Sequence, residues 1–142
     1  MSIVLYGDKN NGLTMLVPCD NSLTLDEIIA KDLPANTEYK IVSKLDIDFD
    51  FFDAYNFNKE IGAVFVSERA KILWKNKWRQ KREFILEKLD KEFMLALEQN
   101  NEIEKQKIVE KKRALRDVTN IEIIGNTPEE IKSIWPDILG EK

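Results

Sequence analysis

Apolar residues recur at every second position in parts of the first third of the chain, which is typical of β-strands. Strands are predicted at 3–6 and 14–17, joined by a turn over 7–12 that contains the turn-forming pair Asn11 and Gly12. A third strand is predicted at 38–42. The chain therefore begins with a β-hairpin and soon adds another strand.

A short helix and a second hairpin are predicted between and after these strands. Thr24 and Glu27 have the spacing of a capping box, and the helix that they begin must end before Pro34. Acidic and hydrophobic residues alternate from residue 46, so the run 46–57 is predicted to be a strand that pairs with 62–66. Residues 1–66 thus form a small α/β head that is rich in β-structure.

The helical pattern that follows is long and uninterrupted. From Ser67, a suitable N-cap, to about Gln99 there is neither Gly nor Pro, so one long helix is predicted. Its apolar residues recur at spacings of four and seven and form one predicted stripe: Trp74, Trp78, Ile85, Leu89, Phe93 and Leu97.

A second helix is predicted from about Ile103 to Val118, after a polar break, with apolar positions at Ile108, Leu115 and Val118. Two helices joined by a short polar turn form an αα-hairpin, here over 67–119. The remaining segment, 120–142, is predicted to hold a short helix that starts at Thr127 and Pro128 and reaches Trp135. The predicted fold class is α+β.

Charge is distributed unevenly along the chain, whose net charge is −4. The predicted head carries 5 basic and 11 acidic residues, a net of −6; the hairpin carries 15 and 10, a net of +5; the last segment carries 2 and 5, a net of −3. Such asymmetry predicts different surfaces on the head and the hairpin. It also favours contacts between unlike parts of neighbouring molecules.

The composition argues against most kinds of catalysis. The chain has no histidine, so His-based triads and most zinc sites are excluded, and we expect no cofactor and no metal. The one cysteine, Cys19, lacks a histidine to activate it, and no phosphate-binding glycine loop occurs. Asp46, Asp48 and Asp50 imitate the start of a calcium loop, but Phe51 and Phe57 stand where such a loop needs Gly and Glu. The protein is predicted not to be an enzyme.

Tryptophans and basic residues are interleaved over 74–82, a pattern that also occurs in nucleic-acid-binding stripes. The same pattern suits an amphipathic helix whose tryptophans pack against a core while the lysine stems lie along it. The acidic net charge favours packing. A nucleic-acid-binding regulator stays as an alternative, and a small inhibitor of a host defence is another.

Several segments occur in an order that resembles a known family. Trp78 and Arg82, then Leu86 and Leu89, then the run 111–119 with its Ala-Leu-Arg-Asp sequence, and finally Trp135-Pro136 resemble the frame of tail assembly chaperones and tail-fibre-associated proteins of tailed phages. Lys112 stands where that family usually has an aromatic residue. The resemblance covers about residues 74–136.

This resemblance implies a non-enzymatic tail-morphogenesis protein, either an assembly chaperone or a small virion component, that binds a tail or tail-fibre protein. Leu86, Met94, Leu95 and Ala96 lie off the predicted stripe, so we expect a homo-oligomer or an obligate complex through the helical region. Without a signal-peptide pattern or a long apolar run, the expected location is the host cytoplasm or the virion, with no membrane. The predicted partner-binding residues are Trp74, Trp78, Arg82, Leu86, Leu89, Phe93, Leu115, Arg116, Asp117 and Trp135.

Overall fold

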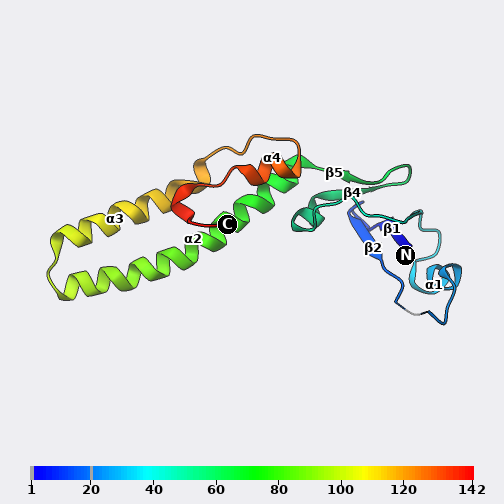
Figure 1. Ribbon diagram of the computed structural model, residues 1–142, viewed down its shortest axis with the longest axis horizontal. Helices are drawn as coiled ribbons and strands as arrows, with labels where there is room; N and C mark the ends of the chain where they lie inside the picture. Colours follow the sequence, from blue (N-terminus) through cyan, green and yellow to red (C-terminus); the bar gives the residue numbers. More distant parts are fainter. Residues whose placement is uncertain (1, 20) are drawn as a thin grey trace. The chain divides into compact units, whose positions relative to one another are not determined.

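The computed structural model describes residues 2–19 and 21–142 (Figure 1). It contains strands and helices in separate parts of the chain, so the predicted α+β class is confirmed. The chain forms two compact units, a head of Met1–Ala70 and a helical unit of Lys71–Lys142, and the boundary falls inside the long helix. The C-terminal segment belongs to the same unit as the αα-hairpin.

The head is built around a central strand, β1 (Ile3–Gly7), which pairs antiparallel with β2 (Leu13–Leu16) on one side and β3 (Tyr39–Val42) on the other. The predicted first hairpin is confirmed. Its turn is held by Asp8, whose Oδ1 accepts hydrogen bonds from the backbone N–H groups of Asn10 and Gly12, each at 2.8 Å.

Both faces of the central strand are covered within the head. On one face, Val4 packs with Ile29 and Leu33, which belong to helix α1 (Leu25–Asp32) and its C-cap. The capping box predicted for this helix is confirmed: the Thr24 hydroxyl accepts from the Glu27 N–H, and the Glu27 carboxylate accepts from the Thr24 N–H at 2.7 Å. This cap satisfies two backbone donors that a helix start leaves unpaired.

A two-stranded sheet lies on the other face of β1. Its strands are β4 (Tyr55–Asn58) and β5 (Gly62–Phe65), and the close approach is at Gly62, where an added Cβ would lie 3.0 Å from Leu5 Cδ1. The φ of Gly62 is 95°, a conformation that other residues adopt at a cost. The predicted second hairpin is confirmed for these residues.

The strand predicted over 46–57 is wrong for residues 46–54. Phe49–Ala54 form a 3-10 helix, η1, which Asp48 caps by accepting a hydrogen bond from the Asp50 N–H at 3.0 Å. Phe51 turns inward and is 1% exposed, while Phe49 is 61% exposed, so the two side chains do not share one buried face. Aspartate side chains compete for backbone N–H groups and favour turns over strands, an effect that the alternating pattern does not reveal.

The helical unit is an antiparallel hairpin of α2 (Ser67–Glu98) and α3 (Glu102–Asp117), as predicted (Figure 1). The turn uses Asn100, with φ 51°, and Asn101, whose side chain caps α3 by accepting from the Glu104 N–H. The apolar positions predicted on α3 and just after it, Ile108, Leu115 and Val118, are all buried.

The predicted stripe on α2 holds near its start and fails at its end. Trp74, Trp78 and Leu89 are buried, but Leu97 is 45% exposed and Ala96 is buried instead. A step of four residues advances about 40° beyond a full turn, so a stripe with repeated four-residue steps moves around the helix and away from α3.

The C-terminal segment lies along the half of α2 nearest its start (Figure 1). It consists of a 3-10 turn η2 (Val118–Asn120), helix α4 (Pro128–Ser133) and a 3-10 turn η3 (Asp137–Leu139). The Trp74 indole N–H donates to the Ile134 carbonyl at 2.8 Å, and the rings of Trp74 and Trp135 lie 5.6 Å apart. The short helix was predicted to reach Trp135, but it ends at Ser133, which leaves the Ile134 carbonyl available to Trp74.

The Thr127 cap predicted for α4 is confirmed, since its hydroxyl accepts from the Glu130 N–H at 3.2 Å. Ile131 and Leu139 are fully buried and secure this segment in the unit. No helix among residues 2–19 and 21–142 is long and apolar enough to cross a membrane.

Candidate functional site

Helices α2 and α3 pack along one line of contact, which can be approached from two opposite sides, here called flanks. On one side, the closed flank, polar contacts cover the line of contact. Lys112 of α3 pairs with Asp90 of α2, and its Nζ lies 5.2 Å from the centre of the Phe93 ring. Nearby, Arg82 Nη1 donates to the Arg116 carbonyl at 3.3 Å. Long basic side chains therefore join the two helices over their apolar contact.

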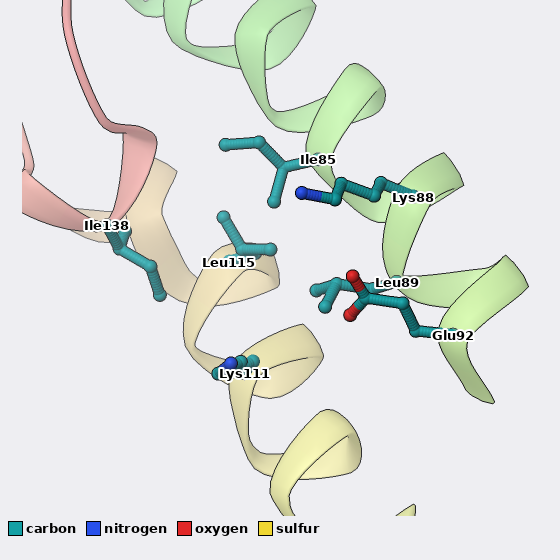
Figure 2. A pocket seen from close by; sticks show the side chains of 7 residues that line it. All are labelled: Ile85, Lys88, Leu89, Glu92, Lys111, Leu115 and Ile138. Atoms are coloured by element: carbon teal, nitrogen blue, oxygen red, sulfur yellow. The ribbon is translucent and has the colours of Figure 1, made fainter. Parts of the chain in front are cut away.

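The other side, the open flank, is not covered in this way. A cavity of about 300 Å³ opens there between α2, α3 and η3 (Figure 2). Its lining combines four apolar side chains with three charged ones: Ile85, Leu89, Leu115 and Ile138, and Lys88, Glu92 and Lys111.

The floor of the open flank is apolar. Figure 2 shows the side chains of Ile85, Leu89 and Leu115 pointing toward one another between the two helices. Leu89 and Leu115 are 5% and 0% exposed, while Ile138, at the edge that the C-terminal segment forms, is 38% exposed. Close packing at the floor thus gives way to exposed apolar surface at the mouth.

The rim of the open flank is charged. Lys88 and Glu92 come from α2, one helical turn apart, and Lys111 comes from α3. Within the described part of the chain, none of these three side chains forms an ion pair or a hydrogen bond. Two cationic groups therefore stand unpaired on opposite helices beside an apolar floor.

The predicted partner-binding residues are distributed over three environments. Trp74, Trp78, Leu89 and Leu115 are buried by the chain itself. Arg82, Leu86, Phe93 and Trp135 are half-buried, and Arg116 and Asp117 are exposed. Only Leu89 and Leu115 of this set line the open flank.

Sequence reasoning did not select five residues of the open flank. Lys88 and Glu92 could be predicted from the sequence. Each directly precedes a residue of the predicted stripe, and such positions border the packed face of the helix. Ile85 was on the stripe and was treated as core. Lys111 and Ile138 carried no local signal, since their role depends on where α3 and η3 pack.

The tryptophans of the 74–82 run serve the core. Trp74 is 4% exposed and Trp78 is 0% exposed, so in this fold neither ring is accessible to a nucleic-acid base. The Trp78 indole N–H is buried and has no acceptor among the described residues.

No group of three or more Cys, Asp and Glu side chains among the described residues is placed to hold a metal ion. The pKa of the Glu27 carboxyl is lowered, first because the Thr24 N–H donates to it and then because of the Thr24 side chain, and this group belongs to the helix cap.

Comparison with known proteins finds no matching family model, no similar curated protein and no similar solved structure.

Proposed function

We propose that this protein acts without catalysis, by binding another protein through its helical unit. The observation that carries the proposal is the open flank, where an apolar floor and unpaired lysines lie at the surface between two long helices. An apolar surface rimmed by polar groups is typical of protein-binding sites. Large apolar side chains are also exposed elsewhere on the same unit, Leu95 at 54% and Ile103 at 72%.

We further propose that the partner is a tail or tail-fibre protein of a tailed phage. The support is the resemblance of residues 74–136 to tail assembly chaperones and tail-fibre-associated proteins. Residues that carry it are joined in one unit: Arg82 donates to the Arg116 carbonyl, and Trp135 packs on Trp74. Such contacts bring segments that carry the resemblance together in the folded unit.

Site-specific photo-crosslinking in infected cells tests both proposals. A photoreactive amino acid is placed at position 138, on the open flank, or at position 84 as a control, since Phe84 is 73% exposed on α2 and does not line the open flank. We expect a crosslink to one tail or fibre protein from position 138 and none from position 84. Equal crosslinking, or crosslinks to nucleic acid alone, contradicts the binding role.

The proposal has two forms, an assembly chaperone and a virion component, which are distinguished by the proteins found in infected-cell lysate and in purified virions. An assembly chaperone is abundant in infected-cell lysate and absent from purified virions, whereas a virion component is present in both. Sedimentation of the purified protein at micromolar concentration then tests the expected homo-oligomer or obligate complex. A monomer that crosslinks no tail protein contradicts the expectation of association through the helical region.

A further inference from the structure

We infer that the open flank receives an amphipathic helix of the partner protein, apolar along one stripe and acidic along its edges. This inference rests on the proposed protein-binding function and specifies the chemistry of the partner. It follows from the course of the cavity along the two helices, from the charges beside it, and from the contrast with the closed flank.

The cavity lining follows both helices, from Ile85 to Glu92 on α2, about two turns, and from Lys111 to Leu115 on α3, about one turn. The C-terminal segment covers the half of α2 nearest its start and reaches the cavity at Ile138. Beyond the cavity, Leu95 lies seven residues after Lys88, two turns along the same side of α2. Ile103 precedes Lys111 by eight residues, which places it about two turns away and about 80° around α3. Exposed apolar side chains therefore occur on both helices nearer the hairpin turn, in addition to those that line the cavity.

A third helix fits such a surface. Side-chain rows on two antiparallel helices form a groove into which the ridge of another helix packs. An amphipathic helix that binds in an apolar groove contacts it through its own apolar residues, at spacings of three, four and seven. A small apolar ligand, in contrast, is usually enclosed over most of its surface. Here the mouth of the cavity is bordered by Ile138, which is 38% exposed, and by exposed lysines.

The charges beside the groove indicate which charge the edges of the partner helix carry. Lys88 and Lys111 flank the cavity from opposite helices without a partner, and Lys107 lies one turn from Lys111 on the exposed side of α3. Glu92 is the one acid that lines the cavity. Carboxylates along both edges of a bound helix would complement this arrangement.

The closed flank provides an internal comparison. There Lys112 is already paired with Asp90 and lies over Phe93, so its charge is used within the fold and its side chain covers part of the ring. The same type of side chain is thus used within the fold on one flank and left without a partner on the other.

Binding of two designed peptides to the full-length protein tests the inference. Both are about 14 residues long, four helical turns, and carry leucines at spacings of three and four; the first has glutamates along its edges and the second has lysines. Fluorescence anisotropy is expected to show that the glutamate-edged peptide binds at least about ten-fold more tightly at low salt. Methyl NMR signals of Ile85 and Ile138 should shift on binding, while that of Ile72, which is 61% exposed on α2 and does not line the cavity, should not.

Charge reversal gives the matched variants. The double variant Lys88→Glu with Lys111→Glu should reverse the preference, so that the lysine-edged peptide binds more tightly. Lys91→Glu with Arg113→Glu makes the same change of charge at exposed positions on the same helices that do not line the cavity, and should keep the wild-type preference. Circular dichroism of both double variants checks that the hairpin remains folded.

The outcomes separate this inference from the proposed function. Absence of binding, equal affinity for the two peptides, or the same loss in both double variants overturns the inference. Binding of dodecanoate with shifts at Ile85 and Ile138, but no binding of either peptide, also overturns it and indicates a small amphiphile. If position 138 still crosslinks a tail protein in cells after Lys88 and Lys111 are reversed, the protein-binding function stands and the acidic-helix inference fails.

Discussion

The two flanks of the α2–α3 hairpin are lined by similar residues but have different surfaces. Lys111 and Lys112 are adjacent in sequence, and a helix turns about 100° for each residue, so they reach opposite flanks. Lys112 meets Asp90 and Phe93 and closes its flank, whereas Lys111 borders the cavity without a partner. The role of a basic residue on this hairpin is therefore set by the residues of the facing helix.

The largest effect is expected in the core that lies below both flanks. Trp78→Ala removes a fully buried side chain, so the free energy of unfolding should fall by roughly 3–5 kcal/mol in urea denaturation. Phe84→Ala on the same helix, at a residue that is 73% exposed, should change it by less than about 0.5 kcal/mol.

Trp78→Phe sharpens this test. It keeps an aromatic ring and removes an indole N–H that has no acceptor among the described residues, so it should cost less than Trp78→Ala. Equal costs for Trp78→Ala and Phe84→Ala would mean that Trp78 is not a core residue.

A second pair of variants compares close packing with the open cavity. Ile131 is fully buried, so Ile131→Phe should overfill its site and lower the free energy of unfolding by roughly 1–3 kcal/mol. Ile138→Phe adds the same volume beside a cavity of about 300 Å³ and should change stability by less than about 0.5 kcal/mol. Thermal unfolding of both variants in one buffer measures the difference. A large loss for Ile138→Phe would show that the open flank has no spare volume.

A third pair compares the two adjacent lysines directly. Lys112→Met removes an ion pair whose acid is mostly exposed and a cation–π contact, so the loss should be about 0.5–1 kcal/mol. Lys111→Met should have no measurable effect on stability, because Lys111 has no partner within the described residues. The loss for Lys112→Met should shrink in high salt, since salt screens the ion pair. Equal effects would remove the distinction between the flanks.

The smallest effect is expected in the head, far along the chain from both flanks. Hydrogen bonds from Thr24 hold the pKa of Glu27 below its ordinary value of 4.5, so the charged carboxylate stabilises the fold above that pH. This contribution is lost as the pH falls through the lowered pKa. Glu27→Gln should therefore flatten slightly the dependence of stability on pH below 4.5 and leave the difference between Lys111→Met and Lys112→Met unchanged. Urea denaturation at pH 3 and pH 7 measures this, and an unchanged dependence contradicts the role of Glu27 in the cap.

Local patterns were sufficient for most elements of the fold. The first hairpin, the capped helix α1, the two helices of the αα-hairpin and the Thr127 cap follow from turn residues, capping pairs and helical periodicity, and each depends on residues within a few positions of one another. Where a local pattern supported two structures, the prediction failed. The run from Asp46 to Phe51 alternates like a strand, but the Asp48 side chain captures a backbone N–H and the chain turns into a 3-10 helix.

The sequence by itself thus determined that this is an α+β protein with a β-rich head and a long helical hairpin, because periodicity and capping act between near neighbours. Only the tertiary structure decided which flank of the hairpin is closed and which is open. That difference depends on α3 meeting α2 in one register and on the C-terminal segment reaching back to Trp74 from Ile134, sixty residues away along the chain. Contacts across such separations depend on how whole elements pack, and periodicity along one helix carries no information about what its neighbour places opposite.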